Sequence, residues 1–196
     1  MSIKRTLLAM AIIAASVGPA SAHPGHSEGM TFVAGLSHPV SGLDHILVMV
    51  AVGIFAATLG GRALWLVPAA FVAAMVAGGL LGYSGVAVPL VEPAIAISVL
   101  AMGLAIAIGL KLPTAAAMGL VAVFALFHGH AHGSEGAALA SFAPYATGFV
   151  VATAALHIAG IGLGVGLDRI GTARGTWLRG AMGAAGALAG IMLLVG

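Results

Sequence analysis

Long apolar segments separated by short connections constrain this chain more than any other feature of its sequence. Each is about 17–25 residues long, the length that a helix needs to cross a hydrocarbon layer about 30 Å thick. The six segments cover residues 36–58, 63–82, 92–110, 114–133, 143–167 and 177–195. Only 6% of the 196 residues are charged, against about 25% in soluble domains, which excludes a water-soluble core. The pattern predicts an all-α membrane protein with a six-transmembrane-helix bundle over residues 36–196.

The first 22 residues have the features of a secretory signal peptide. Lys4 and Arg5 precede the apolar run 7–17, and the sequence A-S-A at positions 20–22 is an A-x-A cleavage site. The apolar run is too short for a membrane span, although a retained signal anchor is the alternative. Cleavage would make His23 the first residue of a histidine-containing periplasmic tail, residues 23–35.

The positive charges that remain after cleavage lie in or beside alternate connections. These cations are Arg62, Lys111, Arg169, Arg174 and Arg179. An excess of Lys and Arg marks cytoplasmic connections, so both mature termini are expected in the periplasm of a multi-pass inner-membrane protein. The five acidic residues of the chain balance these cations, so there is no basic surface for nucleic acid.

The fourth segment ends in F-H-G-H-A-H-G-S-E, which holds the densest group of possible metal ligands. In a helix His128, His132 and Glu135 share one face, because residues three and four apart are neighbours, whereas His130 points away. Imidazole and carboxylate donors suit a borderline divalent cation, and the chain has no cysteine that could supply a thiolate. A solvated histidine-rich turn is the alternative interpretation.

A second group, His38, Asp44 and His45, lies where the first segment enters the membrane. On an unbroken helix the two histidines would stand about 10.5 Å apart along the axis, too far to share one ion. Pro39 suits the first position of a helix, and with Gly42 it would allow His38 to bend back over the other two residues. Alternatively, His38 belongs to an outer relay site, or Asp44 is simply an N-cap.

Further candidates are isolated in the sequence. Glu92 opens the third segment on the same outer side, where it would join the site or only favour the helix dipole. His157 lies about midway along the fifth segment and is either on the ion path or hydrogen-bonded between helices. His23 and His26 in the tail would capture metal or be solvated. Because intramembrane ionisable groups usually mark an ion pathway, we expect the outer clusters to converge in one metal site.

The two motifs resemble the hallmarks of the HupE/UreJ family of six-span membrane proteins, which are accessory to nickel-iron hydrogenase and urease and are regarded as nickel permeases. The first hallmark, H-x5-D-H, is matched by His38, Asp44 and His45. The second, F-H-G-x-A-H-G-x-E, is matched at positions 127–135, with its variable position on His130. The resemblance covers essentially the whole chain.

Together these features predict a secondary-type permease that moves Ni²⁺ from the periplasm toward the cytoplasm, for a hydrogenase or a urease, with Co²⁺ or Zn²⁺ as other candidate ions. The ion is the substrate, and no permanently bound cofactor and no catalytic residue are expected. The expected partners are the divalent ion and the lipid bilayer. The alternatives are an intramembrane zinc hydrolase with Glu135 or Glu92 as general base, and a sensor or chaperone that binds metal without transporting it.

Overall fold

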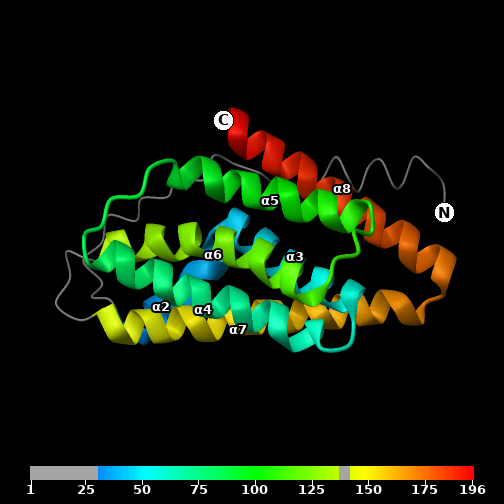
Figure 1. Ribbon diagram of the computed structural model, residues 1–196, viewed down its shortest axis with the longest axis horizontal. Helices are drawn as coiled ribbons and strands as arrows, with labels where there is room; N and C mark the ends of the chain where they lie inside the picture. The colour runs from blue at the N-terminus through cyan, green and yellow to red at the C-terminus, as the bar shows by residue number, and fades with distance from the viewer. Residues whose placement is uncertain (1–30, 137–141) are drawn as a thin grey trace.

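The computed structural model describes residues 31–136 and 142–196, and in these residues every regular element is a helix. The expected signal peptide, His23 and His26 lie outside the described residues. All but the first of the described helices run roughly along one common direction (Figure 1). They are α2 (Phe32–Ser41), α3 (Leu43–Leu59), α4 (Ala63–Tyr83), α5 (Val91–Ala107), α6 (Thr114–Gly136), α7 (Phe142–Arg169) and α8 (Thr172–Val195).

Four of these helices, α4, α6, α7 and α8, are long and apolar enough to cross a membrane by themselves. Helices α2 and α3 pass the same test as a pair, although they are bent by 84° at their junction, and counting them as one span gives five. The first segment is therefore two helices rather than one, and α2 begins at Phe32, before the expected start at residue 36. Helix α5 is apolar but has 17 residues, about 25 Å of helix.

The bundle is assembled from helix pairs that pack closely through glycine. The most extensive contacts join α4 with α6, α5 with α8, and α3 with α7. On α6, a Cβ atom at Gly129 would overlap the backbone carbonyl of Met75, and one at Gly133 would overlap the carbonyl of Gly79, both on α4. Small residues let helix backbones approach in this way, where apolar side chains gain little by leaving lipid. This packing holds the histidine-bearing end of α6 against α4.

Gly129→Ala should therefore lower the melting temperature of the purified protein, because the added methyl group meets backbone that cannot rotate away. Overpacking of this kind costs about 1–3 kcal/mol. Gly119→Ala, on the same helix, is the matched control, since a Cβ atom there meets nothing within 4 Å. Thermal unfolding in detergent should show a lower midpoint for Gly129→Ala and an unchanged or higher one for Gly119→Ala. Equal midpoints would contradict the close α4–α6 contact.

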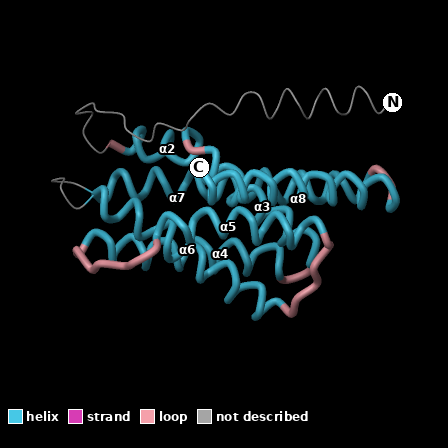
Figure 2. Tube along the Cα trace, turned by 90° about the horizontal axis from the view of Figure 1, so that it is seen from above, coloured by secondary structure: helices cyan, strands magenta, loops and turns pink. Residues whose placement is uncertain are grey.

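The connections α3–α4, α5–α6 and α7–α8 lie together at one end of the bundle, at the right in Figure 1 and again in Figure 2. Two cations at this end bind helix C-termini. Lys111 Nζ donates to the carbonyl of Thr58 near the end of α3, and Arg179 pairs with Asp168 near the end of α7. Cations are favourable there because they complement the helix dipole. The alternate connections that carry the cations in the sequence thus lie at one end of the structure.

Candidate metal site

The site begins at the break between α2 and α3. Gly42 has extended backbone angles, φ −99° and ψ 123°, and separates the two helices. A Cβ atom at Gly42 would lie 2.8 Å from His45 Nδ1 and 2.9 Å from Asp44 Oδ1, so glycine leaves room for both side chains beside the break. The bend brings His38, in the last turn of α2, to 6.0 Å from His45 between ring centroids. His38 therefore does bend back over the start of α3.

The cause of the bend differs from the one expected. Pro39 was predicted to begin a helix, but it lies inside α2, which starts earlier. Thr31 is the N-cap of α2, and its side chain accepts a hydrogen bond from Ala34 N at 3.1 Å. A capping threonine is a strong start signal, so it takes precedence over the proline eight positions later. The break itself lies at Gly42, and α2 lies at one edge of the bundle against α7 (Figure 2).

The histidine face of α6 meets this break, as the helical spacing predicted. His128 and His132 are buried, and His132 Nε2 lies 2.5 Å from His45 Nε2, across 87 positions of the chain. The ring centroids of His45 and His128 are 5.2 Å apart, and those of His38 and His132 are 4.6 Å apart. The two motifs thus place four imidazoles in one cluster, the His cluster, made of His38, His45, His128 and His132.

Two carboxylates lie against the outer nitrogens of this cluster. His45 Nδ1 donates to Asp44 Oδ1 at 3.0 Å, because a carboxylate can only accept. His132 Nδ1 lies 3.5 Å from Glu135 Oε2. When both Nδ1 atoms carry protons, both Nε2 lone pairs point at each other across 2.5 Å, which is repulsive unless a cation lies between them. A cation bound to both would hold the nitrogens about 3 Å apart, a small adjustment.

His128 supplies a further potential donor. Ser98 on α5 donates to its own helix at Ile95 O, 2.6 Å, so its oxygen can accept from His128 Nε2 at 2.9 Å. This arrangement leaves His128 Nδ1 with a free lone pair, and that atom is buried without a hydrogen-bond partner among the described residues. Ser98 was not singled out from the sequence. Its only signal there is a hydroxyl side chain in an otherwise apolar run.

The outer part of the cluster is a second possible ligand group. His38, His132 and Glu135 each offer one ligand atom, and these atoms all lie within 4.8 Å of one another. His132 belongs to both groups, since its Nε2 faces His45 and its Nδ1 faces Glu135. Glu135 is 58% exposed, whereas His132 is 7% exposed at its side chain. The ligand atoms thus form a path from an exposed carboxylate to buried imidazoles.

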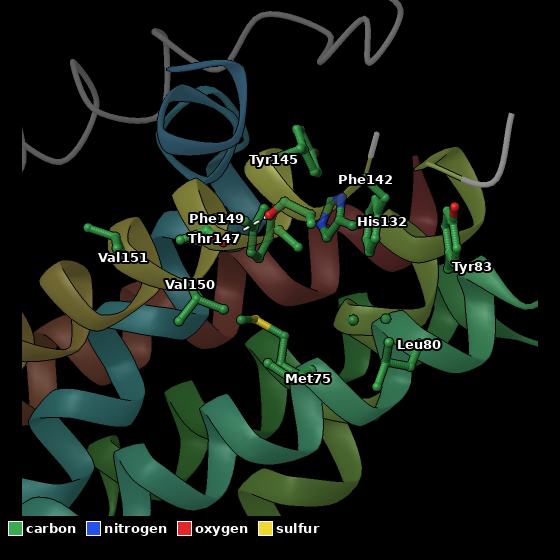
Figure 3. A pocket seen from close by; sticks show the side chains of 15 residues that line it. Met75, Leu80, Tyr83, His132, Phe142, Tyr145, Thr147, Phe149, Val150 and Val151 are labelled. Atoms are coloured by element: carbon green, nitrogen blue, oxygen red, sulfur yellow. Dashed lines mark hydrogen bonds between the residues drawn. The ribbon is translucent and has the colours of Figure 1, made fainter. Parts of the chain in front are cut away.

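A cavity of about 700 Å³ reaches this cluster from the side, between α4, α6 and α7. Figure 3 shows its walls, with His132 among aromatic and aliphatic side chains. Phe149 lies 4.5 Å from His132 between ring centroids. Apolar walls of this kind exclude water, which strengthens the interaction of an ion with the few polar groups present.

Three further polar residues, two of them candidate ligands, lie apart from the His cluster. Glu92 is exposed in the first turn of α5 and shares a separate cavity of about 250 Å³ with Asp44. Contrary to the expectation that it would join the site, it lies apart from the histidines. His130 points away, as predicted, and its Nε2 donates to Val86 O at 2.7 Å. His157 is buried deeper, on α7. Neutral imidazoles backed by carboxylates are typical of sites for borderline divalent ions.

Comparison with known proteins identifies the family to which the chain belongs. The family model described as HupE / UreJ protein matches residues 9–193. Protein HupE of Rhizobium leguminosarum bv. viciae is 52% identical over 178 residues, which cover 90% of this chain and 91% of that protein. No solved structure matches the chain. The chain therefore belongs to the HupE/UreJ family.

Proposed function

We propose that this protein is a permease that carries Ni²⁺, with Co²⁺ as a second candidate, from the periplasm toward the cytoplasm for a nickel enzyme. One observation supports this most strongly: His45 Nε2 and His132 Nε2 face each other at 2.5 Å, each with its other nitrogen near a carboxylate. In this proposal the ligands are His38, Asp44, His45, His128, His132 and Glu135. Glu92 lies near Asp44 as an entry position.

The proposed topology has six passes in the bacterial inner membrane. The bent pair α2–α3 is one pass, and α5 is another, because a bilayer can thin locally to accommodate a helix of 17 residues. A leader at residues 1–22 would be removed, leaving both mature ends in the periplasm. The end of the bundle with Lys111 and Arg179 would face the cytoplasm, and the His cluster would open to the other side.

The arrangement of the ligands also supports transport. The exposed Glu135 can take an ion from water, and the buried imidazoles can then replace part of its hydration shell. Carboxylates offset the charge of the ion, and conduction requires binding loose enough for the ion to leave. The HupE/UreJ resemblance implies an accessory protein rather than a catalyst, which favours transport over hydrolysis.

Purified protein in sealed vesicles tests this function. A permease accumulates radiolabelled Ni²⁺ inside the vesicles at a rate above that of protein-free vesicles, and Co²⁺ competes. Stoichiometric zinc with cleavage of lipid or peptide would instead identify a hydrolase. Binding without accumulation would identify a sensor or chaperone, and either result would contradict the permease.

Uptake should also fall as pH falls through about 6, because imidazole must be unprotonated to bind a metal ion. The direction of this pH effect follows from the ligand type, because protonation of imidazole adds positive charge and removes the lone pair that binds the metal ion. Vesicles with the same pH on both sides separate this effect from any driving force of a proton gradient. Uptake that stays constant between about pH 7.5 and 5 would exclude histidine as the limiting ligand.

A further inference from the structure

A fifth imidazole is buried deeper in the bundle, and nothing in the His cluster accounts for it. His157 on α7 is 1% exposed, and neither of its ring nitrogens has a hydrogen-bond partner among the described residues. An unsatisfied buried polar group costs about 1–3 kcal/mol. A hydrogen bond between helices, the structural role considered from the sequence, therefore does not explain this residue.

A row of rings connects His157 to the His cluster. Ring centroids are 4.6 Å apart for His132 and His45, and 5.2 Å apart for His45 and His128. Phe71 on α4 continues the row, 6.1 Å from His128 and 5.0 Å from His157. His157 thus lies one aromatic ring beyond the innermost member of the cluster.

Two weak metal donors lie one helical turn from His157 and from Phe71, respectively. Thr153 is one turn before His157 on the same face of α7, and its Oγ1 donates to Met75 Sδ at 3.7 Å. Met75 is one turn after Phe71 on α4, and it lines the same cavity as His132 (Figure 3). The cavity wall therefore leads from His132 to the Met75 thioether, which accepts a hydrogen bond from Thr153, one turn before His157.

We propose that His157, with Thr153 and Met75, is an inner, transient binding position for the divalent ion that leaves the His cluster past Phe71. This inference rests on the proposed function and adds an inward step to it. One imidazole with two weak donors and no carboxylate binds a divalent ion loosely, so the ion does not remain there. The inner position lies on α4 and α7, and the Phe71 ring lies close to both His128 and His157.

His157→Leu separates a transport role from a structural one. An apolar side chain removes the unsatisfied nitrogens, so the melting temperature should be unchanged or higher. The initial rate of Ni²⁺ uptake into vesicles should nevertheless fall about tenfold or more, while equilibrium binding of Ni²⁺ in detergent stays within about twofold of the wild type. His157→Gln, which keeps an oxygen donor, should restore part of the uptake.

Thr58→Val is the control for replacing a buried polar side chain, because the Thr58 hydroxyl bonds only within its own helix, to Ile54 O at 2.9 Å. Its uptake should equal that of the wild type. Unchanged uptake in His157→Leu would overturn the inner position and leave the proposed function intact. A lower melting temperature together with weaker binding would also overturn it, since His157 would then be structural. Absence of uptake by the wild-type protein would instead contradict the permease itself.

Discussion

His132→Ala should reduce the initial rate of nickel uptake about 100-fold, while His130→Gln leaves it near the wild-type rate. Both histidines lie on α6, two positions apart, and both are buried. His132 contacts His45, His38 and Glu135, so its loss removes a ligand shared by both halves of the site. Residues that only orient a ligand change metal affinity by about 10–100-fold, so loss of a shared ligand should reach the upper end of that range.

His130 is a stringent control because it differs from His132 only in direction. Its Nε2 donates to Val86 O, and glutamine can keep that donor. Uptake should be measured in cells or vesicles that contain equal amounts of each variant. Wild-type uptake by His132→Ala, or an equal loss in both variants, would show that the direction of the α6 side chains does not determine transport.

Gly42→Val should lower uptake about tenfold or more with little change in stability. The added side chain begins 2.8 Å from His45 Nδ1 and 2.9 Å from Asp44 Oδ1, so both groups must move. Extended backbone at φ −99° accepts valine without strain, so the helix break itself should persist. The hydrogen bond that directs His45 Nε2 toward His132 would then be lost. The variant therefore tests whether transport requires the exact positions of Asp44 and His45.

Ser41→Ala is the matched control for this change, since Ser41 is adjacent and exposed, and among the described residues its hydroxyl bonds only to His38 O within α2. Uptake and melting temperature should be measured for both variants. Wild-type uptake by Gly42→Val would mean that the position of His45 beside the break is not required. A large loss of stability would mean that glycine at the break is needed for the fold as well as for the site.

The face of α6 could be predicted from the sequence because it depends only on local geometry. Helical spacing alone puts His128 and His132 together and turns His130 away, and tertiary packing does not change that. The side on which the clusters meet followed from the alternation of cations. Helical periodicity and the positions of the cations can both be read without knowing which distant residues are in contact.

Other parts of the site could not be predicted because they depend on competition or on packing. Pro39 and Thr31 both favour a helix start, and only the fold decides between them. The burial of Ser98 against His128 depends on how α5 packs beside α6. Glu92 lies on the expected helix turn but at an exposed position, since the rotation of α5 about its axis is set by its contacts with α8 and α3. No local pattern reports such a rotation.

In the proposed site, the His45 and His132 imidazoles bind one metal ion. X-ray absorption of the purified protein loaded with Ni²⁺ measures this directly, because imidazole rings give a distinct scattering pattern around the metal. We expect at least two imidazole ligands in the wild type, a smaller number in each of His45→Ala and His132→Ala, and the wild-type number in His130→Gln. An oxygen-only coordination shell, or the same imidazole count in all variants, would contradict a metal site shared by His45 and His132.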